Sequence, residues 1–208
     1  MRLLILGAGG HGRVVADAAE ASAAGYSEIA FLDDRHPELS RSATWPVVGR
    51  FDALAGLAAR YDACIAAVGD PRLRLKLTQR ACEAGLTIVL IVHARATVSR
   101  YAQVQAGTVV AAGAVVNIGC RIAAGCIINT GATVDHDCRL EQGVHVCPGA
   151  HLAGDVEVGA HSWIGIGAVA RQGIRIGADV TVGAGAVCVE DVRDGAVVSG
   201  VPARERAP

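Results

Sequence analysis

The chain has few aromatic residues and no long apolar segment, and both shortages exclude whole classes of protein. Only 3% of its 208 residues are Phe, Trp or Tyr, and the formal net charge is -1 without an extended basic run. A nucleic-acid-binding surface needs a basic face or stacking aromatics, so nucleic acid is not expected as a partner. The apolar start "MRLLIL" is too short for a signal sequence or a membrane span. We therefore expect a cytoplasmic protein that does not insert into a membrane.

The cysteines form no recognisable metal or disulfide pattern. There are seven of them, an odd number, and none belongs to a Cys-x-x-Cys pair. A zinc or disulfide framework is therefore not favoured, and we expect no metal site. In a reducing compartment, cysteine behaves as a small apolar residue that is usually buried.

Apolar residues recur at every sixth position from Val98 to Cys188 without an insertion. Fourteen of these 16 positions, here called the anchors, hold Val, Ile or Leu. Chance placement of the chain's 54 such residues would put about four there. An uninterrupted hexapeptide repeat predicts a parallel β-helix, in which stacked coils share a core that no single strand forms alone.

Two other positions of each hexapeptide support this prediction. Two residues before an anchor, the side chain also points inward; this position is mostly small and includes Cys120, Cys126 and Cys138. Three residues after an anchor lies a turn position, which is glycine in ten of the 16 repeats. Glycine suits a tight corner because it adopts positive φ without strain.

The first ninety residues alternate strand and helix patterns. We predict strands within residues 2–6, 28–34, 62–70 and 86–93, and helices after "GAGGHG" and over 71–85. The sequence therefore predicts a small Rossmann-like α/β domain over residues 1–93, followed by an all-β β-helix domain over residues 94–208.

A glycine fingerprint opens the first domain. Gly7, Gly9 and Gly12 form G-x-G-x-x-G, and Asp33 with Asp34 ends the next strand. Such glycines let the backbone approach a pyrophosphate, and the acid can hold a ribose. No room remains for a hydride-transfer domain, so an NAD oxidoreductase is not favoured. Two interpretations stay open: packing of a strand against a helix, and binding of a nucleotide other than a dinucleotide.

"GAGGHG", "FLDD", "AAVGD", the hexapeptides and the closing "SGVPAR" together resemble a known family. The chain is similar to the left-handed β-helix sugar acetyltransferases, specifically the nucleotide-amino-sugar N-acetyltransferases of the bacillosamine and perosamine type. The sialic-acid O-acetyltransferases are relatives of these. The resemblance covers residues 2–204. It implies a homotrimer with acetyl-CoA between neighbouring prisms, and a nucleotide-linked sugar held by the N-terminal domain near a catalytic histidine.

The resemblance also assigns roles to individual residues. It implies that His136 in "VDHDC" is the general base and that Asp137, where close relatives have Glu, assists it. The residues implied to contact the nucleotide sugar are Gly9, Gly10, His11, Asp33, Asp34 and Gly69. The residues implied to line the acetyl-CoA groove are His145, Gly154, Ile166 and Ala184.

The repeat itself places His136 at a corner outside the core, two residues after an anchor. A base for acetylation needs such a place, because it must be tethered to a rigid coil and still be accessible. Asp137 occupies the turn position, where Asp155 and Asp179 also occur, so a turn-forming role and a catalytic role are both open for it. His145 is predicted to point outward from a flat face.

The leading hypothesis is an acetyl-CoA-dependent N-acetyltransferase that acts on the amine of a nucleotide-linked 4-amino-4,6-dideoxy sugar. Transfer would be direct, with a histidine base. The alternatives are a sialic-acid-type sugar O-acetyltransferase and a non-catalytic nucleotide-binding scaffold. Apolar residues on the outer faces of the prism predict contact with a partner subunit. These residues are Val109, Val115, Ile127, Val169 and Val187.

Overall fold

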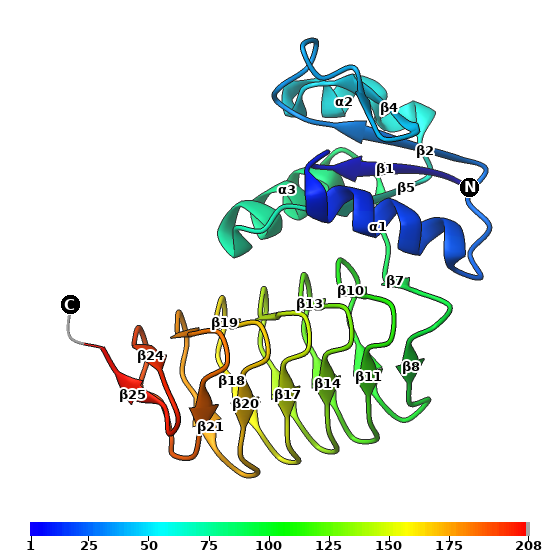
Figure 1. The fold of residues 1–208 in the computed structure, drawn as a ribbon. Coiled ribbons are helices and arrows are strands. Elements are labelled where there is room, and N and C mark those ends of the chain that lie inside the picture. The colour runs from blue at the N-terminus through cyan, green and yellow to red at the C-terminus, as the bar shows by residue number, and fades with distance from the viewer. Residues whose placement is uncertain (207–208) are drawn as a thin grey trace. The chain divides into compact units, whose positions relative to one another are not determined.

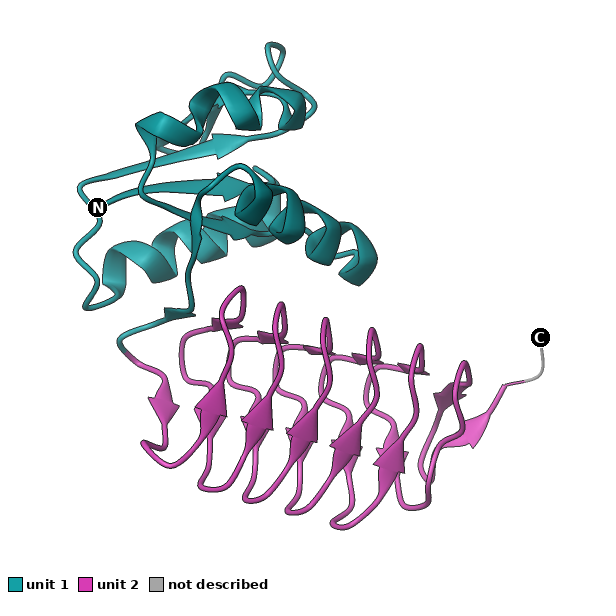
Figure 2. Ribbon diagram, turned by 180° about the vertical axis from the view of Figure 1, so that it is seen from behind, with its two compact units in different colours: residues 1–94 teal, residues 95–208 magenta. Residues whose placement is uncertain are grey.

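The computed structural model describes residues 1–206 and divides into two compact units, residues 1–94 and the residues from 95 onward (Figure 2). The first unit is a mostly parallel sheet with helices. The strands of this sheet are β1 (Arg2–Leu6), β2 (Glu28–Leu32), β3 (Arg41–Ser42), β4 (Trp45–Gly49), β5 (Ala63–Ala66) and β6 (Thr87–Ile88). The short strand β7 (Ile91–Val92) follows and is not part of this sheet. The helices of the unit are α1 (Gly10–Ala21), α2 (Leu54–Leu57) and α3 (Pro71–Glu83), with 3-10 turns η1 (Phe51–Ala53) and η2 (Ala58–Arg60).

The order of strands in this sheet is β3-β4-β2-β1-β5-β6. From β1 the chain passes through α1 to β2 on one side, and from β5 it passes through α3 to β6 on the other. Connections therefore diverge between the neighbouring parallel strands β1 and β5. In parallel sheets, ligands bind at the carboxyl edge at such a point of divergence. The loops that follow β1 and β5 meet there.

The strands and helices predicted for the first ninety residues are confirmed, with three differences. The short helix α2 and its flanking 3-10 turns were not predicted. The segment predicted as one strand over residues 86–93 forms two short strands, β6 and β7. The hairpin β3–β4, which lies at one edge of the sheet, was not predicted. Pro46 in β4 hides the strand pattern, because proline lacks the N–H that a central strand donates.

The second unit is a parallel β-helix (Figure 1). Its 16 strands β8 to β23 are, in order, Thr97–Val98, Gln103–Val104, Val109–Val110, Val115–Val116, Arg121–Ile122, Ile127–Ile128, Thr133–Val134, Arg139–Leu140, His145–Val146, His151–Leu152, Glu157–Val158, Trp163–Ile164, Val169–Ala170, Arg175–Ile176, Thr181–Val182 and Val187–Cys188. The strands β24 (Val197–Ser199) and β25 (Arg204–Glu205) follow. Each of the 16 strands ends on a predicted anchor.

Each strand from β8 to β20 pairs in parallel with the strand three hexapeptides further along the chain, as Val116 does with Val134. Three hexapeptides therefore make one coil, and the strands form three faces: β10-β13-β16-β19-β22-β24-β25, β8-β11-β14-β17-β20-β23 and β9-β12-β15-β18-β21. The anchors from Val110 onward are buried and form the core. All ten glycines at the predicted turn position have positive φ, which confirms the reason for their placement.

The inward cysteines do more than fill space. Cys120, Cys126 and Cys138 are buried, as predicted. Each thiol also donates a hydrogen bond to a carbonyl of the next coil, as Cys120 Sγ does to Asp135 O at 2.9 Å. The hydroxyl groups of Thr108 and Ser162 make the same contact. These polar side chains tie each coil to the next one.

The expectation that five apolar residues line the outer surface is only partly correct. Val109 and Ile127 are 1% and 0% exposed, and they lie in register with His145 on one face. Val169, on another face, is 37% exposed. Within residues 1–206, no helix has the length and apolar character needed to cross a bilayer.

Candidate active site

His136 and Asp137 form a polar pair at an exposed corner of the β-helix, after β14. The Nδ1 atom of His136 lies 2.9 Å from the Oδ2 atom of Asp137. The two side chains are 56% and 65% exposed. Because a carboxylate only accepts hydrogen bonds, Nδ1 carries the proton and Nε2 presents its lone pair. The structure therefore contains an accessible imidazole in the tautomer that a general base needs.

Negative charge around His136 raises its basicity. The hydrogen bond to Asp137 raises the pKa of His136 above its ordinary value, with further contributions from the charges of Asp135 and Asp137. Asp135 also accepts a hydrogen bond from the backbone N–H of His136, at 2.8 Å. Asp137 has a φ of +61°, so it serves the turn as well as the imidazole. The two roles that the sequence left open are compatible in one residue.

Two glycines make room for this pair. A Cβ atom on Gly119, one coil before Asp137, would lie 2.2 Å from Asp137 Oδ1. A Cβ atom on Gly154, one coil after His136, would lie 2.4 Å from His136 Nε2. Real Cβ atoms do not approach so closely, so a side chain at either position would displace the pair. The carboxylate and the imidazole occupy space that the neighbouring coils leave empty.

The four residues implied to line an acetyl-CoA groove lie in three places. Ile166 and Ala184 stack on one corner, where Gly185 N donates to Ile166 O at 2.8 Å. Gly154 lies on a different corner, against His136. His145 lies on a strand of the face that contains β16. Within one chain, the structure does not bring these four residues together.

His145 is buried, a feature that its predicted outward position did not indicate. It is only 7% exposed, and its ring packs edge-on against Trp163 with centroids 4.2 Å apart. Asn129 Nδ2 lies 3.0 Å from His145 Nε2, on the neighbouring coil. Packing between stacked outward side chains therefore immobilises this imidazole. Asn129 is a candidate that the sequence analysis missed, although it stands directly after the anchor Ile128.

The glycines of the first unit divide into two kinds. A Cβ atom on Gly7 would lie 2.8 Å from Val68 Cγ1, and one on Gly12 would lie 2.0 Å from Gly7 O. These two glycines pack a strand against a helix. Gly9, Gly10 and Gly69 instead have no atom within 4 Å of such a Cβ. The packing interpretation of the fingerprint therefore holds for Gly7 and Gly12, whereas the open glycines leave accessible backbone where the loops after β1 and β5 meet.

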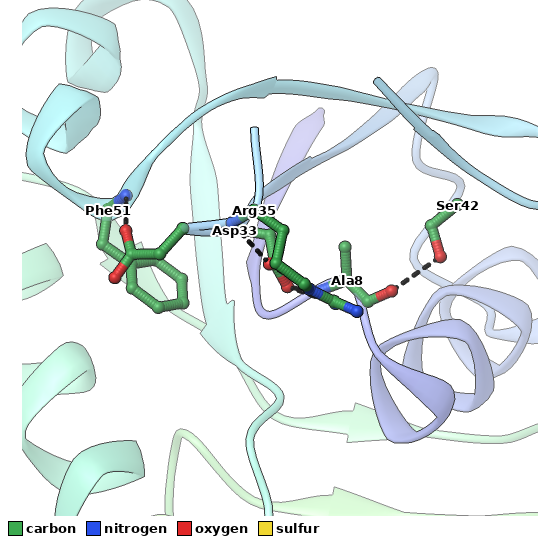
Figure 3. Close-up of polar contacts among 6 residues, drawn as sticks. Ala8, Asp33, Arg35, Ser42 and Phe51 are labelled. Carbon is green, nitrogen blue, oxygen red and sulfur yellow. Dashed lines mark hydrogen bonds and ion pairs between the residues drawn. The ribbon is translucent and has the colours of Figure 1, made fainter. Parts of the chain in front are cut away.

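Asp33 organises the turn after β1 (Figure 3). Its Oδ2 atom accepts from Ala8 N at 2.8 Å, and its two oxygens accept from Arg35 Nε and Nη2 at 2.7 and 2.8 Å. The hydrogen bonds from Arg35, and then those from the backbone, lower the pKa of Asp33 to about 2. A ribose contact by Asp33 would have to replace one of these bonds. Asp34 accepts from Phe51 N at 3.0 Å instead.

Arg35 is a second candidate that the sequence analysis missed. Its side chain is 60% exposed, and Asp33 takes up only Nε and Nη2 of its guanidinium, which has five N–H groups. Figure 3 shows the guanidinium beside Ala8, in the glycine turn. The signal was present in the sequence, since Arg35 directly follows the two aspartates.

His11 lies in the first turn of α1 and is mostly buried. Burial, and then the charge of Arg74, lowers the pKa of His11 to about 4. Arg74 is fully buried and donates to the carbonyls of Val68 and Gly69, in the loop after β5. At neutral pH, His11 is therefore an uncharged hydrogen-bonding group at this edge. Among residues 1–206, no group of three or more His, Cys, Asp or Glu side chains is arranged to hold a metal ion.

Comparisons with known proteins agree with this architecture. Residues 2–81 match the family model of the PglD N-terminal domain. The acetyltransferase domain of PglB from Neisseria gonorrhoeae, solved with acetyl coenzyme A, is 44% identical, with 99% of this chain and 98% of that chain covered and a TM-score of 0.94. The chain belongs to the hexapeptide-repeat sugar acetyltransferases. A search of curated protein sequences gave no match.

Two further solved structures are similar over the same length. PerB from Caulobacter crescentus, solved with CoA and GDP-perosamine, is 38% identical, with 100% of this chain and 98% of that chain covered and a TM-score of 0.94. WeeI from Acinetobacter baumannii has the same fold, with a TM-score of 0.91 at 24% identity. The left-handed β-helix expected from the resemblance is confirmed. As a member of this family the chain is an acetyltransferase, so the non-catalytic scaffold is not favoured.

Proposed function

We propose that the chain transfers the acetyl group of acetyl-CoA to the 4-amine of a nucleotide-linked 4-amino-4,6-dideoxy sugar, with His136 as general base. The observation that carries this proposal is the exposed His136–Asp137 pair. The Nε2 atom of His136 lies in the space that the missing side chain of Gly154 leaves open. GDP-perosamine in the PerB complex supports a nucleotide-linked amino sugar as the acceptor.

The chemistry needs a base at one step. As the amine nitrogen attacks the thioester carbonyl, a C–N bond forms and the amine must lose a proton. His136 Nε2 accepts this proton, because Asp137 holds the other nitrogen protonated. The C–S bond then breaks, and the imidazolium returns the proton to the departing sulfur. No protein nucleophile is needed, since the thioester is already activated, so the transfer is direct.

The nucleotide part of the acceptor is proposed to bind at the carboxyl edge of the sheet in the first unit. Gly9, Gly10 and Gly69 leave the backbone open there, and α1 begins at this point, so the positive end of its dipole lies at this edge. His11 adds a neutral hydrogen-bonding group, and Asp33 orients Arg35 beside the turn. These groups suit the acceptor oxygens of a nucleoside diphosphate.

Acetyl-CoA is proposed to bind between neighbouring prisms of a homotrimer. The residues implied for its groove lie at separate places on one prism, and a groove assembled from two subunits would bring them together. Ile118 and Ile166, at two of these corners, are 54% and 61% exposed. Large exposed apolar side chains of this kind are typical of subunit interfaces.

The test is an acceptor comparison with the full chain. CoA release would be measured with acetyl-CoA and three classes of acceptor: UDP- and GDP-linked 4-amino-4,6-dideoxy sugars, the matching 4-hydroxy sugars, and free sialic acid. We expect release only with a nucleotide-linked amine, and an amide in the product. Release with the hydroxyl acceptors and an ester product would contradict the proposal and favour an O-acetyltransferase.

A further inference from the structure

The corner that carries His136 lies between two equivalent corners of the neighbouring coils. Residues 117–119 form that corner in the preceding coil, and residues 153–155 form it in the following coil. Asp137 N donates to Ile118 O at 3.0 Å, and Asp155 N donates to His136 O at 2.9 Å. The backbone of His136 and Asp137 is therefore tied to the coil on either side.

Asn117 makes the side-chain contact of the preceding coil. Its Nδ2 atom donates to Asp135 Oδ1 at 2.7 Å, and the same oxygen accepts from His136 N at 2.8 Å. Cys120 Sγ donates to Asp135 O at 2.9 Å. Both the side chain and the carbonyl of Asp135 are thus fixed by residues of the preceding coil. Asn117, followed by the backbone of His136, holds the pKa of Asp135 below its usual value, so Asp135 stays an ionised acceptor at neutral pH.

These contacts matter because packing restrains the base only in part. The side chain of His136 is 56% exposed, so packing contributes less to its orientation than it does for a buried imidazole. The groups that face it and carry or acquire charge are Asp135, Asp137 and the thiol of Cys120. A misplacement of about 1 Å in a catalytic group can cost about 100-fold in rate.

We propose that Asn117 is a positioning residue for the acetyl transfer, which holds the Asp135 carboxylate in the place where it fixes the His136 corner. The inference rests on the proposed role of His136 as base. Asn117 acts through Asp135 and has no part in the proton transfer itself. It adds to the site a residue of the preceding coil, distant from the base in the sequence and stacked beside its corner in the fold.

Four variants test the inference: Asn117→Ala, Asp135→Ala, Asp135→Asn and the control Asp194→Ala. The control removes a similar bond at another corner, since Asp194 Oδ1 accepts from Ala178 N at 2.9 Å. For each variant, kcat, KM, the pH profile of kcat/KM and Tm would be measured with acetyl-CoA and the amino-sugar acceptor. The pKa of His136 would be followed by NMR.

Asn117→Ala and Asp135→Ala are expected to lower kcat by about 10- to 100-fold with KM changed less than about threefold. Their loss of Tm should not exceed that of the control, which keeps its kcat. Asp135→Asn retains an oxygen that accepts from Asn117 and from His136 N, so kcat should stay within about threefold. Its acidic pH limb should move to lower pH, because one negative charge beside His136 is lost.

A kcat of Asn117→Ala equal to wild type, or one that falls only as much as in Asp194→Ala, would overturn the inference. If Asn117→Ala does not fold, the Asp135→Ala and Asp135→Asn pair decides: equal kcat in the two also overturns it. His136→Ala separates the two claims. Normal kcat in His136→Ala refutes the base itself, whereas an inactive His136→Ala beside an unimpaired Asn117→Ala refutes only the positioning role.

Discussion

The imidazole of His136 occupies the space into which a side chain at Gly154, one coil further along the prism, would project. A Cβ atom at Gly154 would come within 2.4 Å of His136 Nε2. Gly154→Ala should therefore turn the imidazole away and lower kcat by about 10- to 100-fold. Steady-state kinetics distinguish this displacement of the imidazole from a role of Gly154 in the acetyl-CoA groove. A raised KM for acetyl-CoA at unchanged kcat would contradict the contact with His136 as the main function of this glycine.

Gly119 should be as sensitive, because the Asp137 carboxylate fills the space beside it. Gly119→Ala combines two effects: strain at a φ of +78° and displacement of Asp137. Gly195→Ala is the matched control, with a φ of +70° and open space where the methyl group would go. Both should lose about 1–2 kcal/mol of stability from the backbone strain. Only Gly119→Ala should also lose kcat, and equal activity in the two variants would refute the packing argument.

The charge of Asp137 should set the acidic limb of the pH profile. Its hydrogen bond raises the pKa of His136, and the base works only when neutral, so activity is lost as pH falls through that raised pKa. Asp137→Asn removes the charge, so the limb should move to lower pH. The plateau of kcat/KM should fall as well, because the tautomer is no longer fixed. An unchanged limb in Asp137→Asn would show that Asp137 is only a turn residue.

The glycines of the first unit should separate binding from packing. Gly10→Ala places its methyl group in open space, whereas Gly12→Ala places it 2.0 Å from Gly7 O. Gly10→Ala should keep its Tm and raise the Kd for UDP or GDP about tenfold or more, since the methyl group occupies the site proposed for phosphate. Gly12→Ala should lose Tm. Calorimetry and a thermal melt measure both effects, and unaltered nucleotide affinity in Gly10→Ala would place the nucleotide elsewhere.

The sequence predicts the β-helix almost completely, because its repeat has a fixed period and no insertion. Each of the 16 strands ends on a predicted anchor. Once three hexapeptides are known to make a coil, the length of a coil predicts which residues stack. By that rule Asn117 faces Asp135, Gly119 faces Asp137 and Gly154 faces His136. The contacts of Asn117, Gly119 and Gly154 with this corner could therefore have been predicted from the spacing, although no local motif indicates them.

Other features depended on contacts that no local pattern indicates. The pairing of Arg35 with Asp33 involves side-chain rotamers within a turn, which the glycine fingerprint does not specify. His145 is buried because Trp163 and Asn129 stack against it from neighbouring coils. The hairpin β3–β4 contains a proline that conceals its strand pattern. In each case, the conformation depends on interactions that the local sequence pattern does not specify.

The most direct measurement of the central claim is CoA release by the wild type and by His136→Ala, with acetyl-CoA and a nucleotide-linked 4-amino sugar, across the pH range in which imidazole titrates. We predict that the variant loses about 10²- to 10⁴-fold in kcat, the usual contribution of a general base, and loses the acidic limb of the pH profile as well. A variant that keeps the wild-type rate and pH profile would show that another group removes the proton from the amine.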